Sequence, residues 1–499
     1  MKVVERQSIN GRIHSKLRWL LIRLLAGVVV CSPLVLLEGV LRLWVPDPGL
    51  PLEDPYISFG ELRPLFVPDA SGTILETAPE RLRYFCPQSF SASKSSQTYR
   101  IFCLGGSTVQ GRPLSVETAF STWLKLNLEV LCPDRAIEMV NCGGISYASY
   151  RLVPLMEELL QYQPDLFILY TGHNEFLEDR TYRRLKNVPR MLIGLHHRLL
   201  HLRTYQLVDR YLASRGNSDE SKTVLSTEVK TKLDVKTGLS TYHRDPVWQQ
   251  GIIEHFRRNL EVLVQTAQRA DVPIILMNPV SNLKDCPPFK SEFGRDQSQE
   301  DQDRVIALWE QARQGDTSDP WSRLHLLEQA AALDDQHAGL LYQLGISYAQ
   351  TGRFSEAKSY FLAAKEQDIC PLRMLEPMHQ TVKEVASRHG IPLVDVRELI
   401  EQRSAHRIPG QEWCSDHVHP NINGHQLIAD ALTDCLAEQQ LFRYPDHWRE
   451  EREQLWQTHL QSLGDIYYQD GFTHLRMLEN WSGRRIPRNR LRGRDPNAP

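Results

Sequence analysis

The sequence predicts an α/β fold built on a five-stranded parallel sheet with helices on both faces. Apolar, strand-like runs recur along the chain, at Arg100–Leu104, Ile137–Asn141, Asp165–Tyr170, Val272–Asn278 and Ile391–Val396. Helical patterns of apolar residues lie between them, at Leu152–Gln161 and Ile252–Ala270. Continuous apolar strands that alternate with helices are typical of a parallel sheet covered on both faces. Ligands of such sheets bind at the carboxyl ends of the strands, so we looked for chemistry just after each run.

The composition is that of an ordinary globular protein. The 499 residues include 58 basic and 61 acidic side chains, for a formal charge of −3, and 41% of them are hydrophobic. These values exclude a collagen-like, coiled-coil or fully disordered chain. A mean hydropathy of −0.39 is too polar for a protein with many membrane spans. Nucleic-acid binders usually carry a strongly basic surface, so we expect no nucleic-acid partner.

The chain begins with a predicted single-pass membrane anchor. Residues 1–18 are basic and residues 19–45 are largely apolar, with an uncharged stretch at Leu24–Leu37. A span needs about 20 apolar residues, which requires Arg23 and Arg42 to extend toward the membrane surface. The preceding basic residues predict a cytoplasmic N-terminus, and the lack of a small-residue cleavage site favours an uncleaved anchor over a signal peptide. The remainder would then be extracytoplasmic, on the periplasmic side in a bacterium.

The rest of the chain divides into five parts. Residues 46–96 are rich in proline and predict an irregular neck. The α/β domain is expected to occupy residues 97–299, with an insertion at 180–246, and to resume at 372–440. Residues 441–499 predict an amphipathic helical region followed by a basic, disordered tail.

The part between the two halves of that domain, residues 300–371, predicts a helical insertion. Ala338–Pro371 matches a tetratricopeptide unit of about 34 residues, with small and apolar side chains where two helices of a hairpin would pack. A plain helical hairpin is the alternative. Such repeats often bind other proteins, so the insertion predicts a protein partner.

Two glycines separate the first strand from Ser107. Glycines between a strand and a helix allow a tight turn that lifts a serine hydroxyl to the edge of the sheet. A phosphate-binding loop is the alternative, because Gly106 and Gly111 have the required spacing. That motif continues with Lys and Ser or Thr. Arg112 and Pro113 stand there instead, which argues against a phosphate loop.

Small or polar residues follow the second and third strands as well. The turn from Gly144 to Ser146 can bring a backbone N–H toward the serine. Asn174 follows the third strand and can donate a hydrogen bond to a developing oxyanion. A loop asparagine is also a common helix cap, so neither feature alone predicts a site.

The fourth segment combines a carboxylate with histidines. Asp416 stands three residues before His419, a spacing that lets the carboxylate bond the Nδ1 atom and fix the tautomer. Nε2 is then available to take a proton from a serine, as in an acid–base–nucleophile triad. His417 is a rival base. A metal site of Asp416, His417 and His419 is a further alternative, but it lacks another ligand motif. We therefore predict neither a metal nor a cofactor.

Together these four segments resemble the SGNH/GDSL hydrolase superfamily, over about residues 97–290 and 375–440. The resemblance implies a flavodoxin-like three-layer α/β/α sandwich. It also implies roles for individual residues. Ser107 would be the nucleophile, His419 its base and Asp416 the acid that orients this base. The oxyanion donors would be Asn174 and either Ser146 or Gly144. The anchor, the insertion and the phrase Gly-His-Asn-Glu-Phe resemble a membrane-anchored branch from bacteria that contains tetratricopeptide repeats.

The sequence departs from the family pattern in three places. Gly-Gly-Ser replaces Gly-Asp-Ser at the nucleophile, although the missing Asp is not a triad member. The family glycine of the second segment falls on Ser146, with Gly144 as the alternative. Glu175 replaces the usual Asp after Asn174, which leaves the hydrogen bonding of that loop undetermined.

The resemblance implies a membrane-anchored, extracytoplasmic serine esterase that acts on an O-acyl ester. A small molecule or an acetylated glycan would be its substrate. An O-acyltransferase that modifies an exported polysaccharide is one alternative, because the same triad can serve both reactions. A non-enzymatic scaffold that binds a partner through the insertion is the other.

Overall fold

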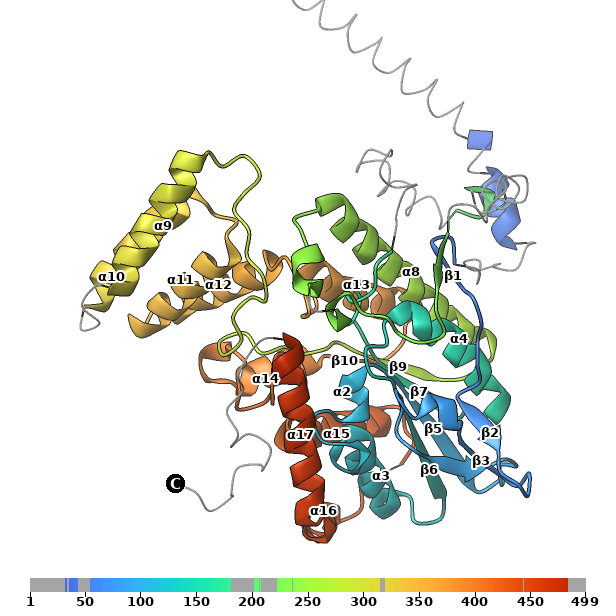
Figure 1. Cartoon of the computed structure of the whole chain (residues 1–499). Coiled ribbons are helices and arrows are strands. Elements are labelled where there is room, and N and C mark those ends of the chain that lie inside the picture. Colours follow the sequence, from blue (N-terminus) through green and yellow to red (C-terminus); the bar gives the residue numbers. More distant parts are fainter. Residues whose placement is uncertain are drawn as a thin grey trace, which may run out of the picture. The chain divides into compact units, whose positions relative to one another are not determined.

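The computed structural model describes most of the chain (Figure 1), namely residues 32–33, 36–43, 54–180, 202–205, 207, 222–235, 237–314, 319–442 and 444–482. The chain divides into two compact units. Met1–Ile57 and Tyr182–Thr223 form one, and Ser58–Thr181 and Val224–Pro499 form the other. The sheet, the helical insertion and the candidate site all belong to the second unit.

The central sheet has five parallel strands in the order β10-β9-β7-β5-β6. This confirms the predicted parallel sheet, and each predicted run contains a strand. The strands are β5 (Thr98–Gly105), β6 (Ala136–Gly143), β7 (Leu166–Tyr170), β9 (Ile274–Met277) and β10 (Leu393–Val394). Gly105 pairs with both Gly143 and Tyr170, so the carboxyl ends of three strands are level. The segments that follow these strands therefore meet at one edge.

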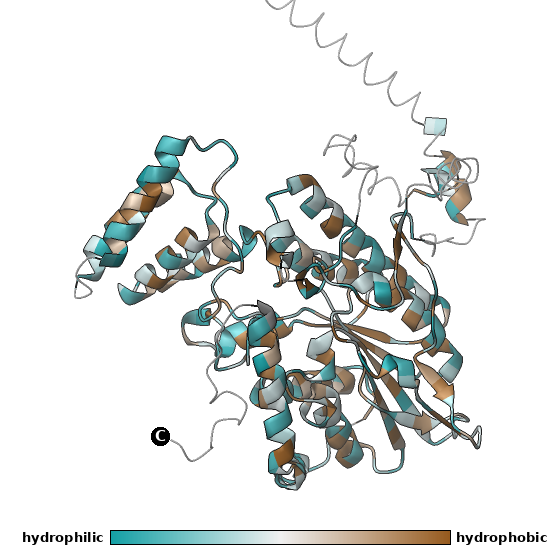
Figure 2. Ribbon diagram, viewed as in Figure 1, coloured by the Kyte–Doolittle hydropathy of each residue, from teal (hydrophilic) through white to brown (hydrophobic). Residues whose placement is uncertain are grey.

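Helices cover both faces of the sheet (Figure 1). Alternate strand residues such as Ile101 and Cys103 belong to the apolar cluster on one face, together with Trp123. The strands are hydrophobic along most of their length (Figure 2), as expected when both faces are buried. One face is covered by α3 (Phe120–Leu131), α15 (Ile422–Glu438) and α16 (Trp448–Ser462), and the other by α4 (Ser149–Leu159), α8 (Pro246–Arg269) and α13 (Glu376–His389).

The segment expected to be an irregular neck is partly regular. A three-stranded antiparallel sheet forms within residues 46–96 from β2 (Phe66–Pro68), β3 (Ile74–Thr77) and β4 (Ser89–Ser91). The ring of Phe90 packs edge-on against Phe66 at 4.9 Å and Phe102 at 5.7 Å, which anchors this sheet to the main one. Strands of three or four residues carry too little alternation to be recognised without these contacts. A further pair, β1 (Ile57–Phe59) and β8 (Thr223–Leu225), forms a two-stranded sheet.

The described part of the insertion contains four helices, α9 (Gln299–Gln314), α10 (Pro320–Leu333), α11 (Ala338–Gln350) and α12 (Phe354–Glu366). They share one apolar cluster, which includes Leu327, Leu344 and Phe361. A side chain at Gly345 would overlap the Phe361 ring, so this glycine allows α11 and α12 to approach closely. These contacts suit a helical hairpin, and the assignment to tetratricopeptide repeats stays a prediction.

Two further helices belong to the second unit. The helix α14 (Val396–Arg403) follows the last strand of the sheet, and α17 (Asp465–Ser482) follows α16. Most of the predicted anchor at 19–45, much of the insertion at 180–246 and the basic tail beyond 482 lie outside the described residues. Among the residues that the structure does describe, no helix combines the length and apolarity required to cross a bilayer.

Candidate active site

Ser107 begins a short helix, α2 (Ser107–Gln110), directly after β5. A side chain on Gly105 would overlap the Tyr170 carbonyl, and one on Gly106 would overlap the Asn174 amide. Both glycines are therefore needed for the close approach of β5 to its neighbours. The turn leaves Ser107 half-buried at the carboxyl edge of the sheet, as the glycine pattern predicts.

A chain of hydrogen bonds joins Ser107, His419 and Asp416. The Ser107 Oγ atom lies 2.7 Å from His419 Nε2, and His419 Nδ1 lies 2.6 Å from Asp416 Oδ2. The other carboxylate oxygen accepts the backbone N–H groups of Val418 at 2.8 Å and His419 at 2.9 Å. Asp416 and His419 are 4% and 5% exposed, so water competes little for these bonds. The structure thus brings Ser107 together with His419, which follows it by 312 positions in the chain. We call Ser107, His419 and Asp416 the acid–base side.

The electrostatics of Asp416 determine which atoms carry hydrogens. Burial alone would raise the pKa of this carboxyl, but His419, His417 and the hydrogen bonds hold that pKa well below its ordinary value. An ionised carboxylate can only accept hydrogen bonds. His419 Nδ1 therefore donates to Asp416, and Nε2 is left to accept a hydrogen bond from the Ser107 hydroxyl.

The alternative roles of these histidines fit the geometry less well. His417 Nδ1 lies 3.4 Å from Asp416 Oδ1, and its ring packs edge-on against Phe289 at 5.1 Å. Both ring nitrogens of His419 already have partners, which leaves none for a metal. Among the described residues, no group of three or more His, Cys, Asp or Glu side chains is arranged to hold a metal ion.

Asn174 and Ser146 follow β7 and β6, the two strands that flank β5, and we call these two residues the donor side. The Asn174 amide donates to the Tyr147 carbonyl at 2.9 Å, which fixes its orientation and leaves its second hydrogen available. Its nitrogen lies against Gly106, next to Ser107. Asn174 is therefore positioned beside the nucleophile turn rather than capping a helix.

The structure distinguishes the two candidates for the family glycine. The Gly144 N–H donates to the Gly105 carbonyl at 3.0 Å and so extends the sheet. The Ser146 N–H has no backbone acceptor among the described residues. Ser146 also has a φ of 61°, in the left-handed region that favours glycine. Among the described residues, Ser146 therefore keeps an unused backbone donor, whereas the Gly144 N–H is already bonded.

Glu175 supplies the hydrogen bonds that the sequence left undetermined. It is fully buried, and its two carboxylate oxygens accept from the Ser149 backbone N–H at 2.7 Å and the Ser149 hydroxyl at 3.0 Å. The first turn of α4 therefore receives its cap from the Asn174 loop instead of from its own N-cap residue, Ala148. Burial raises the pKa of Glu175. This bond ties the Asn174 loop to the segment that follows Ser146.

Sequence reasoning missed His173, which precedes Asn174 in the chain. His173 is 5% exposed, and its Nδ1 atom accepts the backbone N–H of Met374 at 3.2 Å. Burial, with smaller effects from His417 and His419, lowers its pKa to about 3, so the ring is neutral. Nothing in the sequence near His173 signals this contact, because Met374 lies 201 positions away.

No family model and no curated protein matches the chain. Among solved structures, similar ones include a lipolytic protein of the G-D-S-L family from Desulfitobacterium hafniense DCB-2, with 11% identity and a TM-score of 0.30, over 67% of this chain and 98% of that one. The acetyl xylan esterase AlAXEase has 12% identity and a TM-score of 0.30, over 68% and 99%. The acetylxylan esterase Axe2 from Geobacillus stearothermophilus has 14% identity and a TM-score of 0.30, over 69% and 96%. These values are too low to bear on function.

Proposed function

We propose that the protein is a serine hydrolase that cleaves O-acyl esters at Ser107. The observation that supports this most is the uninterrupted hydrogen-bond chain from Asp416 through His419 to the Ser107 hydroxyl. Such a chain is the arrangement that general-base activation of a serine requires. The unused donors of Ser146 and Asn174 add to this support.

In the proposed first half-reaction, His419 removes the proton of Ser107 as its oxygen attacks the ester carbonyl. Asp416 holds the ring and stabilises its positive charge. The carbonyl oxygen gains a negative charge and accepts hydrogen bonds from the N–H groups of Ser107 and Ser146 and from the Asn174 amide. His419 then gives its proton to the departing alcohol, which leaves an acyl ester on Ser107.

In the second half-reaction, His419 activates a water molecule that attacks this ester and releases the acid. A sugar hydroxyl in place of water would give acyl transfer instead. The resemblance to SGNH hydrolases implies a small-molecule or glycan ester, with an acetylated glycan as the substrate class to test first. Analysis of the products with and without a glycan acceptor separates hydrolysis from transfer.

The direct test is turnover of p-nitrophenyl acetate by the purified protein. We expect Ser107→Ala to abolish measurable turnover, because the acyl ester of the proposed mechanism forms on the Ser107 oxygen. Ser359→Ala, which removes an exposed hydroxyl on α12, is the control and should match the natural protein. Equal activity in Ser107→Ala would refute the proposal.

We also propose that residues 19–45 anchor the chain in a membrane, with the hydrolase outside the cytoplasm. The hydropathy of that stretch and the basic residues before it support this. An alkaline phosphatase fusion after residue 96 tests it, because that enzyme becomes active only after export. An inactive fusion that is expressed at full length would contradict the placement.

A further inference from the structure

The segment that leaves the helical insertion carries buried charges that the proposed mechanism does not use. This exit segment, residues 367–375, connects α12 to α13. Its Asp368 and Arg373 side chains are 4% and 2% exposed. Buried charges are costly unless they are paired and hydrogen-bonded, so their partners indicate what they hold in place.

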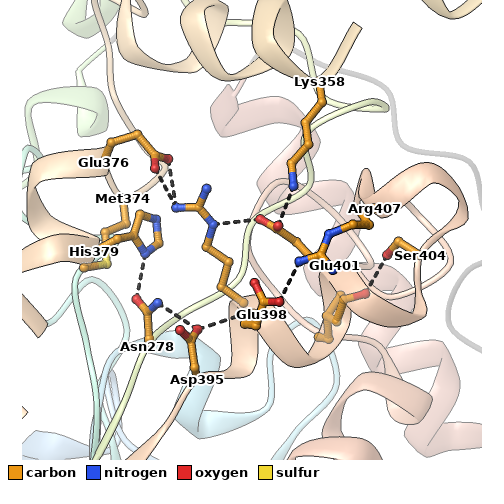
Figure 3. A network of polar contacts seen from close by, with 12 residues as sticks. Asn278, Lys358, Met374, Glu376, His379, Asp395, Glu398, Glu401, Ser404 and Arg407 are labelled. Atoms are coloured by element: carbon orange, nitrogen blue, oxygen red, sulfur yellow. Dashed lines mark hydrogen bonds and ion pairs between the residues drawn. The ribbon is translucent and has the colours of Figure 1, made fainter. Parts of the chain in front are cut away.

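Ion pairs fix both ends of the exit segment to the α/β domain. Figure 3 shows Lys358 of α12 pointing toward Glu401 of α14. This ion pair has a length of 2.5 Å, and Arg397 of α14 bonds Glu376 at 2.8 Å. The buried Lys365 at the end of α12 also bonds Glu376 at 2.8 Å. The segment between these anchors is therefore held firmly enough to position other groups.

Arg373 bonds a loop that is in turn hydrogen-bonded to the segment with the acid and base. Its Nη1 atom donates to the carbonyls of Asn282 at 3.1 Å and Cys286 at 2.7 Å. Asn282 in turn donates its side-chain amide to the Asp416 carbonyl at 3.2 Å and its backbone N–H to the His417 carbonyl at 2.9 Å. Two hydrogen bonds thus separate Arg373 from the backbone of Asp416.

Asp368 supports the same arrangement from the other end of the segment. Its carboxylate accepts the backbone N–H groups of Phe289 at 2.7 Å and Lys290 at 3.0 Å, and lies 3.7 Å from Arg373 Nη2. The ring of Phe289 packs against His417. Burial raises the pKa of Asp368 to about 6, against the lowering effect of Arg373. The pair therefore braces the chain from Asn282 to Lys290.

We propose that Arg373 is a positioning residue for catalysis: through Asn282 it fixes the loop that carries Asp416 and His419. This inference rests on the proposed function. The Met374 N–H bonds His173 beside Asn174, so the exit segment also contacts the donor side. The exit segment thus contributes to the geometry of the site without a direct contact to the reacting atoms.

The test compares two buried arginines. Arg100 is 0% exposed and also donates to two backbone carbonyls, of Tyr162 at 2.6 Å and Ser91 at 2.7 Å. It lies near the start of β5, at the sheet edge opposite to Ser107. Arg373→Met and Arg100→Met therefore remove similar buried groups. Arg373 is linked to the candidate site through Asn282, and Arg100 lies far from it.

We expect Arg373→Met to lower kcat for p-nitrophenyl acetate about 10- to 100-fold with KM within about twofold, because small misplacements of catalytic groups have effects of this size. Arg100→Met should keep kcat within about twofold at a temperature where circular dichroism shows both variants folded. The downfield NMR signal of the His419 Nδ1 proton should shift or broaden only in Arg373→Met.

The outcomes separate the two proposals. An inactive natural protein would refute the proposed ester hydrolysis. An active natural protein with unchanged kcat and an unchanged His419 signal in Arg373→Met would overturn the positioning role, as would equal losses in both arginine variants. If Arg373→Met does not fold, Asn282→Ala removes the link to Asp416 while keeping Arg373. The kcat and the His419 signal of that variant then test the positioning role in the same way.

Discussion

The two sides of the candidate site are built on opposite principles. On the acid–base side, Ser107, His419 and Asp416 are joined by short hydrogen bonds before any substrate binds. On the donor side, the Ser146 N–H and one hydrogen of the Asn174 amide have no acceptor among the described residues. The hydrogen bonds of the acid–base side are therefore all formed within the protein. Those of the donor side form only when a ligand supplies an oxygen as the acceptor.

This difference matches what each side would have to do. A base must be oriented in advance, so its ring is bonded on both nitrogens. Oxyanion donors are effective when they are fixed in space but unsatisfied until negative charge develops. Neighbouring residues hold these donors in place: Glu175 caps α4, and the Tyr147 carbonyl accepts one hydrogen of the Asn174 amide. Substitutions on the two sides should therefore differ in size and kind.

The largest effect is expected on the acid–base side, from Asp416→Asn. Asparagine keeps an oxygen for the Val418 and His419 N–H groups, but its amide favours the wrong tautomer of His419. We expect kcat to fall about 10⁴-fold with little change in stability, as loss of the orienting carboxylate does in serine proteases. Steady-state kinetics with p-nitrophenyl acetate measure this. A loss below tenfold would remove Asp416 from the proposed triad.

A smaller effect is expected on the donor side, from Asn174→Ala. Removing one oxyanion donor costs about 10²–10³-fold in kcat, because the backbone donors remain. Asn127→Ala is the control, since the side-chain amide of the buried Asn127 also donates a hydrogen bond, to Thr433 at 2.8 Å on the covering helices. Equal kcat losses in the two variants at matched folding would mean that Asn174 acts only through stability.

The pH dependence of stability tests the surroundings of the acid–base side. His425 accepts the Phe120 N–H at 3.2 Å, and burial, with a smaller effect from His419, lowers its pKa to about 3. An ordinary unfolded histidine binds a proton below about pH 6.5, whereas folded His425 does not. Its contribution to stability is therefore present above pH 6.5 and is lost as the pH falls toward 3.

From pH 7.5 to pH 5, this single group should lower the free energy of unfolding by about 2 kcal/mol. His425→Asn keeps an acceptor for Phe120 but does not titrate. Urea unfolding at both pH values should show a decrease that is smaller in the variant by that amount. The same decrease in both proteins would mean that His425 is protonated in the fold.

The smallest effect is expected from Ser146→Gly. The backbone N–H is retained, so kcat should stay within about twofold. Glycine relieves the strain of the left-handed φ but adds freedom to the unfolded chain, for a net gain of about 0.5 kcal/mol. Ser359→Gly makes the same change at a helical position and should destabilise by a similar amount. Urea unfolding measures the free energy of unfolding of both variants. A lower value for both would mean that Ser146 is not in a strained turn.

The two sides also differ in how far the sequence predicts them. Asp416 and His419 are three residues apart, so their bond follows from local spacing. The turns at Ser107 and Asn174 follow from strand ends that the apolar runs reveal. These features are local, or they depend only on the rule that parallel strands end at one edge.

The supporting contacts were not predictable in the same way. Glu175 meets Ser149, and Arg373 meets Asn282, across 26 and 91 positions, and neither pair has a spacing that signals a contact. The choice between Gly144 and Ser146 required a φ value and a hydrogen-bond partner. The short strands in residues 46–96 required the packing of Phe90. Each depends on tertiary contacts that a single sequence does not encode locally.

The most direct measurement for the central claim is the site of covalent labelling by a fluorophosphonate, mapped by mass spectrometry of the digested protein. We expect one adduct, on Ser107, which disappears in Ser107→Ala and forms much more slowly in Asp416→Asn. An adduct on another serine, or undiminished labelling of Ser107→Ala, would contradict the account.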